Sequence, residues 1–404
     1  MRFNLKQFGP GLIFAGAAIG VSHLVQSTRA GADFGLGLVW ALLLVNLCKY
    51  PFFQFGPRYS LATGESLLDG YHKMGKSLLW VYFIITFATM FTIQTAVTIV
   101  TAGIANSLFG GYISTEIWTL IILSICFGIL MKGRYALLDK LMKVIVIVLT
   151  ISTLAAVIIA LNTTDQNLNW KQIIPANATE VGFLIAFMGW MPAPLDISIW
   201  HSLWALEKNK DDQEYSVKSS LFDFNVGYIA TIFIGLCFIL LGTLVMFHSG
   251  ESLSGSAGIF ANQLISMYTE NLGNWAYIII GIAAFTTMFS TTLTTLDASP
   301  RSMTKAHELL FKGKNKHGYL IWMIFLTLGT LAIFFFLKSE MVWLITIATI
   351  LSFLTAPFYA IVNYLLISGK HTPKEWRPSL KMHIMSWIGI TFLIGFSIWY
   401  LTNL

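Results

Sequence analysis

Three side chains that could bind a metal ion interrupt long apolar stretches of this sequence. His23 lies in the first such stretch, and Met191 and Asp196 lie close together in a later one. Imidazole and thioether groups suit transition metals, and carboxylate oxygens also bind harder divalent cations. We therefore predict a metal site made by His23, Met191 and Asp196. Ordinary packing of these side chains in the protein core is the alternative.

Neighbouring polar groups extend this predicted site. Ser22 offers a hydroxyl group, and Gly20 lies in a stretch rich in glycine and alanine, where an unwound backbone would expose carbonyls. Histidine, with an ordinary pKa of about 6.5, can also carry a proton, so His23 and His201 are candidates for a proton relay. The predicted substrate-binding residues are Gly20, Ser22, His23, Met191 and Asp196.

The composition explains why these polar side chains stand out. Of the 404 residues, 56% are hydrophobic and 11% are charged, whereas about 25% of residues are charged in a typical soluble protein. The mean hydropathy is +0.72. A soluble core cannot hide so much apolar surface, so we predict a lipid bilayer as the solvent. An acid at membrane depth is a functional candidate, and for Asp196 the alternative is an ion pair with Arg29 or Lys49.

Charge, cysteine content and motifs argue against other classes of function. The net charge is +6, but the basic residues are spread over many short loops and form no nucleic-acid-binding patch. The three cysteines lie far apart in apolar runs, without the spacing of a zinc finger or a redox motif. The sequence has no nucleophile elbow, no HExxH motif and no carboxylate pair at catalytic spacing. We expect no enzymatic activity and no bound cofactor.

The apolar stretches predict eleven membrane helices, because about 20 apolar residues are needed to cross a bilayer. The fold expected from them is an all-α polytopic membrane protein. The predicted segments lie near residues 10–30, 36–56, 77–105, 116–131, 144–161, 181–203, 224–247, 275–297, 318–337, 341–367 and 383–402.

The distribution of basic residues predicts how these helices are oriented. If the N-terminus is cytoplasmic, 21 of the 25 Lys and Arg residues fall in inner loops. Arg29, Lys171 and Lys338 fall on the outer side, and Lys49 lies within a predicted segment. This bias is typical of the positive-inside rule. We therefore expect a multi-pass protein of the inner membrane, with a cytoplasmic N-terminus and an extracytoplasmic C-terminus.

The first and sixth segments are predicted to be broken helices. The first is rich in glycine and alanine, and the sixth contains Pro192 and Pro194, which each lack a backbone N–H group. The two breaks are five segments apart and lie in segments of opposite direction, as in transporters built from inverted repeats. We predict one transmembrane domain over residues 1–404. Its parts are a first repeat (10–161), an inverted second repeat (181–367) and an extra helix (383–402). Close packing with simple kinks is the alternative.

Hydroxyl side chains crowd the end of the eighth segment. In some transporters with this arrangement of helices the eighth helix helps to hold sodium, which is an analogy of fold only. The alternative is that these hydroxyls satisfy neighbouring backbone groups. The residues concerned are Ser290, Thr291, Thr292, Thr294 and Thr295.

Several short motifs, mostly near the N-terminus, resemble the NRAMP family of divalent-metal transporters. They are GPG at residues 9–11, AGADFG at 30–35, RYSLATG at 58–64, NSLFG at 106–110, and Met191-Pro192, which matches the start of the family's MPH motif. The resemblance implies a LeuT-like fold of two five-helix repeats. It also implies secondary active transport of a divalent metal by alternating access.

The same alignment shows where residues that the family uses are missing. GVSH at residues 20–23 takes the place of the family's metal-binding DPGN motif, and Ala193 takes the place of the MPH histidine. Gln94 and Val97 align with an acidic pair used for protons, and Thr355 aligns with a family glutamine. The candidate coupling or relay residues are therefore Gln94, His201 and Thr355.

Two functions follow as predictions. The first is coupled transport of a cation, expected to be a divalent metal ion, with H⁺ or Na⁺ as the coupling ion. The second is transport of a small organic solute or an anion on the same scaffold, because one acid, one histidine and helix N-termini suit such a cargo nearly as well. The expected partners are the lipid bilayer and the transported solute. We expect no nucleic acid and no obligate protein partner.

Overall fold

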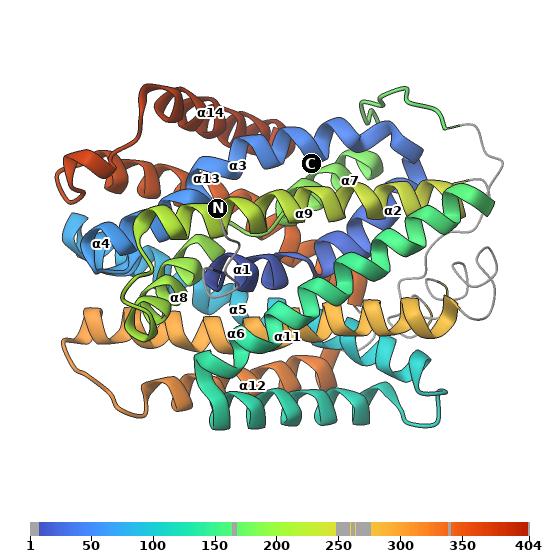
Figure 1. The fold of residues 1–404 in the computed structure, drawn as a ribbon, viewed down its shortest axis with the longest axis horizontal. Coiled ribbons are helices and arrows are strands. Elements are labelled where there is room, and N and C mark those ends of the chain that lie inside the picture. The colour runs from blue at the N-terminus through green and yellow to red at the C-terminus, as the bar shows by residue number, and fades with distance from the viewer. Residues whose placement is uncertain are drawn as a thin grey trace.

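The computed structural model describes residues 8–163, 168–247, 259, 263, 276–337 and 341–402, and these residues form a bundle of helices (Figure 1). Most of the long helices run along the long axis of the molecule. The elements are α1 (Pro10–Ala18), η2 (Ser22–Ser27), α2 (Thr28–Phe34), η3 (Gly35–Leu38), α3 (Val39–Thr63), α4 (Leu67–Met74), α5 (Lys76–Leu108), α6 (Thr115–Thr163), α7 (Ala178–Trp190), α8 (Ile197–Asp211), α9 (Val217–Met246), α11 (Ala276–Phe311), α12 (Gly318–Leu337), α13 (Met341–Ser368), η4 (Lys374–Trp376) and α14 (Leu380–Thr402).

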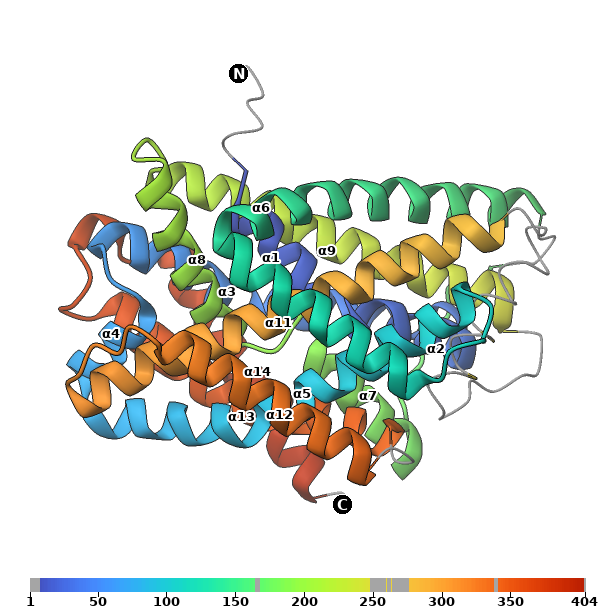
Figure 2. The same ribbon diagram turned by 90° about the horizontal axis from the view of Figure 1, so that it is seen from below.

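The predicted membrane segments coincide with these helices, so the all-α polytopic fold is confirmed. Within the described residues, 8 helices are long and apolar enough to cross a membrane. The fourth and fifth predicted segments both lie in the single element α6, and its stretches Thr115–Lys132 and Leu137–Asn162 are separate candidate spans, as the sequence predicted. The two halves of α6 nevertheless run in opposite directions (Figure 2).

Both predicted helix breaks are present. Residues 19–21 separate α1 from η2, and residues 191–196 separate α7 from α8, with a cis peptide bond between Met191 and Pro192. These short stretches are almost entirely buried. Such burial is expected, because irregular backbone at membrane depth is tolerated only inside protein or beside a cavity.

Close backbone contacts hold both halves of the first membrane helix against α9. A side chain at Gly11 would collide with the backbone of Asp223, and one at Gly31 would collide with the backbone of Ile239. Small residues at such crossings let membrane helices approach closely. Both sides of the first break are therefore packed tightly against one neighbouring helix.

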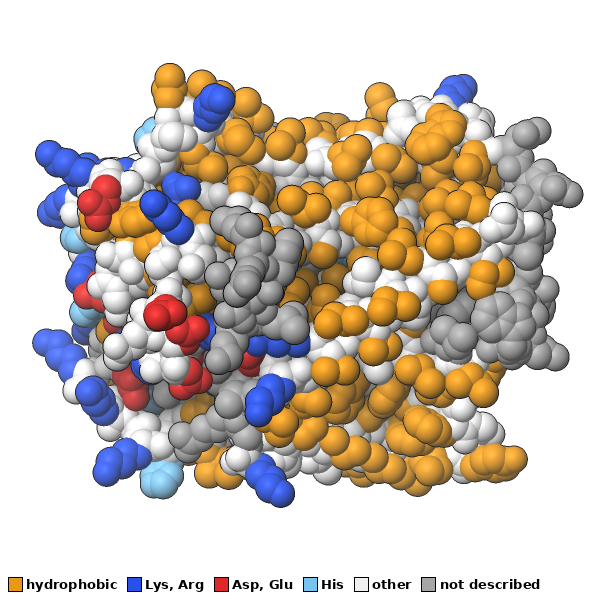
Figure 3. Space-filling view, in the orientation of Figure 1, with side chains coloured by type: hydrophobic (Ala, Val, Ile, Leu, Met, Phe, Trp, Pro, Cys, Tyr) orange, Lys and Arg blue, Asp and Glu red, His pale blue; other side chains and the backbone are white. Residues whose placement is uncertain are grey.

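The surface agrees with a protein that spans a membrane. Figure 3 shows apolar side chains over most of the length of the helices, whereas the charged side chains gather at one end. Large apolar side chains such as Phe336 and Ile229 are 87% and 65% exposed, which suits contact with lipid tails. The charged end contains α4, α8 and the connection from α11 to α12 (Figure 1). We call it the charged end below.

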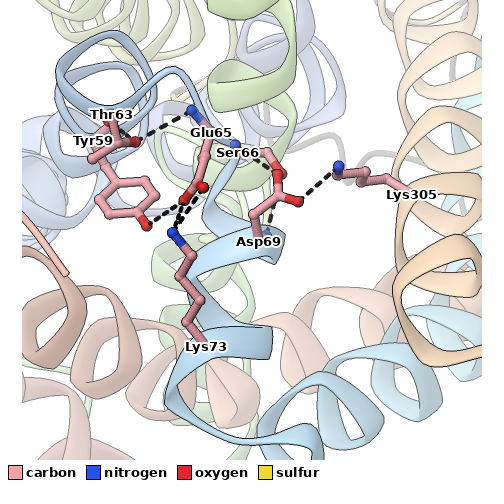
Figure 4. A network of polar contacts seen from close by, with 7 residues as sticks. All are labelled: Tyr59, Thr63, Glu65, Ser66, Asp69, Lys73 and Lys305. Atoms are coloured by element: carbon pink, nitrogen blue, oxygen red, sulfur yellow. Dashed lines mark hydrogen bonds and ion pairs between the residues drawn. The ribbon is translucent and has the colours of Figure 1, made fainter. Parts of the chain in front are cut away.

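An ionic network joins three elements at the charged end (Figure 4). The short helix α4, which the rule for apolar segments does not detect, begins with a capping box between Ser66 and Asp69. The Asp69 carboxylate also pairs with Lys305 of α11 at 2.7 Å. Glu65, just before α4, pairs with Lys73 at 2.6 Å. The network links the end of α3, α4 and α11.

Candidate functional site

A small cavity lies between the two helix breaks. Its volume is about 30 Å³, which is enough for one or two water molecules. Gly20 and Ser22 line it from the first break, Trp190 and Trp200 from the sixth segment, and Thr291 from α11. We call this space the central cavity. Two of the five predicted substrate-binding residues, Gly20 and Ser22, line it.

The carbonyl end of α1 is satisfied by hydroxyl groups of α11. The Gly20 amide turns away from Gly16, its helical acceptor, so the Gly16 carbonyl is freed. The Ser290 hydroxyl donates to this carbonyl at 3.0 Å. The Thr291 hydroxyl lies 3.4 Å from the same carbonyl and 3.3 Å from that of Ile19. These hydroxyls therefore satisfy backbone groups, as the second interpretation of the eighth segment expected.

The carbonyl end of α7 is satisfied by a lysine. Lys49 of α3 is completely buried. Its Nζ donates to the carbonyls of Met188 (2.9 Å), Gly189 (2.7 Å), Met191 (3.0 Å) and Ala193 (3.3 Å). From the sequence, Lys49 was placed inside a membrane segment, with an ion pair to Asp196 as its role in the alternative interpretation. Its charge at membrane depth is the signal that could have marked it.

The amide ends of the two following helices face the central cavity. The helical stretch after the first break begins beside it with Gly20 and Ser22, and α8 begins beside it at Ile197. The first amides of α8 bond back to nearby carbonyls, for example from Ile197 to Pro194 at 3.2 Å. The dipole of each helix still directs its positive end toward the cavity. The cavity therefore favours negative charge.

His23 lies behind Ser22 and does not line the central cavity. Its Nε2 lies 3.0 Å from the Thr231 carbonyl of α9, which can only accept, so Nε2 carries the hydrogen. Its Nδ1 lies 2.7 Å from the Ser22 hydroxyl. Both ring nitrogens are therefore occupied. To bind a metal ion through Nδ1, the protein would have to move the Ser22 hydroxyl away.

Met191 and Asp196 also lie outside the central cavity. The Met191 side chain is buried in the apolar core. Asp196 lines a separate hollow of about 10 Å³ together with Thr355, and its Oδ1 has no partner in the described part of the chain. The alternative ion pairs are not formed. Lys49 binds the carbonyls above, and the Arg29 guanidinium lies 5.5 Å from the centre of the Phe183 ring.

The structure thus does not bring the three predicted metal ligands to one cavity. No group of three or more His, Cys, Asp and Glu side chains that could hold a metal ion occurs within the described ranges. A metal site made by His23, Met191 and Asp196 stays a prediction.

The three relay candidates lie in different surroundings. Gln94 connects α5 to α11, because its Nε2 donates to the Thr292 carbonyl at 3.3 Å and its Oε1 accepts from the Thr295 hydroxyl at 2.7 Å. The Thr355 hydroxyl donates to a carbonyl of its own helix at 2.8 Å. His201 is fully buried, and neither ring nitrogen has a partner among the described residues. The three do not form one chain of hydrogen bonds.

Asp223 is a further buried acid that sequence reasoning missed. Its Oδ2 accepts from the Gly9 amide at 3.1 Å, the Gly11 amide at 2.8 Å and the Tyr215 hydroxyl at 2.9 Å. A carboxylate on the first amides of a helix satisfies free donors and favours the helix dipole. Asp223 thus caps α1 from α9. The signal was an acid at the edge of a predicted membrane segment.

Known proteins resemble this chain over nearly its whole length. The family model described as natural resistance-associated macrophage protein-like matches residues 11–403. The protein "Uncharacterized protein PM0681" of Pasteurella multocida is 36% identical over 403 residues, which are 98% of this chain and 92% of that protein.

Solved structures share the fold. A manganese transporter of Eremococcus coleocola matches with a TM-score of 0.73 at 12% identity, covering 97% of this chain and 85% of that chain. MhsT in complex with L-phenylalanine matches with a TM-score of 0.73 at 15% identity, covering 100% of this chain and 99% of that chain. The predicted LeuT-like architecture is therefore confirmed.

Proposed function

The chain belongs to the Nramp family of membrane transporters, and from this premise we propose that it is a secondary active transporter of a small organic anion, such as a short carboxylate. The observation that carries the proposal is the distribution of backbone dipoles at the two helix breaks. The carbonyl ends of α1 and α7 are occupied by donors of the protein itself. The amide ends of the next helices face the central cavity.

A cation would have to displace the protein's own donors to gain ligands at this site. A divalent ion needs several oxygen, nitrogen or sulfur ligands in place of its water shell. The Gly16 carbonyl accepts a hydroxyl group, and the α7 carbonyls accept the Lys49 ammonium. A carboxylate at this place is favoured by the positive ends of two helix dipoles, and it would share first amides that already bond to nearby carbonyls. The site therefore favours an anion over a cation.

The walls of the central cavity suit a carbon skeleton. Val97 of α5 and the two tryptophans, Trp190 and Trp200, line it. The Trp190 indole is fixed by a hydrogen bond of 2.9 Å from its Nε1 to the Ser352 hydroxyl. Apolar walls with a few placed polar groups are typical of sites for small organic molecules. At about 30 Å³ the space is smaller than such a molecule, so the helices around the breaks must separate to admit it.

Related folds support an organic cargo as well as a metal. MhsT was solved in complex with L-phenylalanine, and the transporter MHP1 was solved with bromovinylhydantoin bound. The second candidate function for this chain is transport of a divalent metal ion. It is favoured by the likeness to manganese transporters and by the His23 Nδ1 beside the first break.

The proposal includes the membrane in which the protein lies and its orientation there. We assign the protein to the inner membrane, with the charged end in the cytoplasm and the C-terminus on the outside. The support is the excess of basic residues in the loops of one side. The repeats over residues 10–161 and 181–367, with the extra helix 383–402, form the proposed domain plan. The coupling ion is H⁺ or Na⁺.

Uptake into liposomes tests the proposed function. The purified protein is reconstituted and offered radiolabelled short carboxylates, amino acids and Mn²⁺ in parallel, with and without gradients of H⁺ and Na⁺. We expect saturable uptake of a carboxylate and no uptake of Mn²⁺. Uptake of Mn²⁺ without uptake of any organic anion would reject the proposal in favour of the second candidate.

A pair of variants ties the uptake to the central cavity. Val97→Trp fills the cavity, because Val97 lines it and is 2% exposed. Val144→Trp makes the same change on the outer face of α6, where Val144 is 61% exposed. We expect Val97→Trp to abolish uptake and Val144→Trp to leave it unchanged. Equal uptake by both variants would show that the cargo binds elsewhere.

A further inference from the structure

The Lys49 ammonium group is surrounded by backbone carbonyls, the ligand type that also holds monovalent cations. Its Nζ lies within 3.3 Å of four backbone carbonyl oxygens of the sixth membrane segment. No carboxylate of the described residues lies within 4.0 Å of it. The positive charge of this side chain therefore meets only backbone dipoles at close range.

The sequence explains why these carbonyls are free. A helix would pair the Met188 carbonyl with the amide of residue 192, but residue 192 is proline and has no N–H group. The helix ends at Trp190, so its last carbonyls have no partner within the helix. The negative end of the α7 dipole lies at the same place. Free carbonyls at a buried helix end need a donor or a cation.

The geometry resembles the coordination of an ion more than a set of directed hydrogen bonds. A lysine ammonium has three N–H donors, whereas four carbonyls surround Nζ at 2.7–3.3 Å. A group of backbone carbonyls that replaces a hydration shell is the way in which potassium channels hold K⁺. The ammonium group is similar to K⁺ in charge and size. Lys49 reaches this group of carbonyls from a different helix, α3.

We propose that the carbonyls of Met188, Gly189, Met191 and Ala193 form a monovalent-cation site that Lys49 permanently occupies with its own ammonium group. The protein consequently needs no dissolved Na⁺ or K⁺ to stabilise the break in its sixth membrane helix. This inference goes beyond the proposed function, because it concerns what holds the break together and not what the central cavity carries.

Removal of the lysine side chain tests the inference by chemical rescue. Lys49→Ala empties the site, and the matched control is Lys171→Ala, which removes an exposed lysine. Thermal unfolding of each purified protein is measured in choline, Na⁺, K⁺ and methylammonium chloride at one ionic strength. Uptake of the cargo that the liposome assay identifies is measured in the same salts. Thermal unfolding requires no cargo, so this result stands even if the organic-anion proposal fails.

We expect the wild type and Lys171→Ala to unfold at the same temperature in choline, K⁺ and methylammonium. In Na⁺ both proteins should gain the same stability if Na⁺ is the coupling ion. Lys49→Ala should unfold earlier in choline and recover in K⁺ or methylammonium, and its uptake should fall at least tenfold in choline and recover in the same salts. If Lys49 served only for packing, neither the unfolding temperature nor the uptake of Lys49→Ala would recover when the cation is changed.

Three results would overturn the inference. They are a wild type whose unfolding temperature rises specifically with K⁺, a Lys49→Ala variant that equals the wild type in choline, and a folded Lys49→Ala variant that no cation restores. If Lys49→Ala does not fold in any salt, Lys49→Met keeps the apolar volume and is judged by the same comparison. The wild-type measurement remains decisive in either case.

Discussion

A methyl group added at Gly20 should destabilise the first helix break by a predictable amount. Gly20→Ala would bring its Cβ into collision with the Thr291 hydroxyl and to 2.9 Å from the Thr291 Cγ2. Overpacking of this kind costs about 1–3 kcal/mol. The matched control is Gly182→Ala in α7, where an added Cβ meets nothing within 4 Å. In a helix this exchange stabilises by roughly 0.5–1 kcal/mol.

A second substitution identifies the contact that is responsible. Thr291→Ala removes the hydroxyl and the Cγ2 against which the new methyl group would press. By itself it also removes the weak hydroxyl contacts to the Gly16 and Ile19 carbonyls, at about 0.5–1.5 kcal/mol for each hydrogen bond. In Gly20→Ala with Thr291→Ala, the steric cost should fall in part, because the remaining Cβ at position 291 still lies 3.0 Å from the new methyl group. The double variant should thus be more stable than the sum of the single effects predicts, by at least ~1 kcal/mol.

Chemical unfolding in mixed detergent micelles measures these differences. The free energy of unfolding should be lowest for Gly20→Ala and highest for Gly182→Ala, with a gap of about 1.5–4 kcal/mol between them. If Gly20→Ala is as stable as Gly182→Ala, or if the effects at Gly20 and Thr291 simply add, then the tight contact between the first break and α11 does not exist.

Three further predictions concern contacts that hold the helices together. Asp223→Asn should lower the free energy of unfolding by about 0.5–2 kcal/mol, because the charge that caps α1 is lost; an unchanged unfolding curve would contradict this role. Gln94→Leu should cost about 0.5–1.5 kcal/mol, because the hydrogen bond from the Thr295 hydroxyl across to α5 is lost while this hydroxyl keeps the carbonyls of its own helix, and stability equal to the wild type would show that the bond is unimportant. The Lys305–Asp69 pair is partly exposed, so a double-mutant cycle should give less than about 1 kcal/mol, falling with added salt; a larger, salt-independent coupling would refute this.

The sequence was sufficient to predict most of the architecture. A helix that crosses a bilayer needs a long run of apolar residues, so the membrane segments could be recognised from such runs in the sequence. The break in the sixth segment was visible because Pro192 and Pro194 cannot both continue a helix. The turn within α6 was visible because the basic residues Lys132, Arg134, Lys140 and Lys143 separate two apolar stretches.

The candidate site was predicted less well, because side-chain direction depends on neighbours that are distant in sequence. His23 lies at the first break as expected, but its ring is bound by a carbonyl of α9, 208 residues away. Lys49 meets carbonyls that lie 139–144 residues further along the chain. One sequence cannot show such contacts. It can only mark a buried charge as a group that needs a partner.

The fastening of α1 to α9 has a mechanical consequence. The Asp223 carboxylate accepts hydrogen bonds from the first amides of α1, and the backbone at Gly11 is in close contact with the backbone of α9. If a pathway to the central cavity opens by an outward movement of α1, α9 must move with it as one rigid unit, or the three hydrogen bonds at Asp223 must break in every transport cycle.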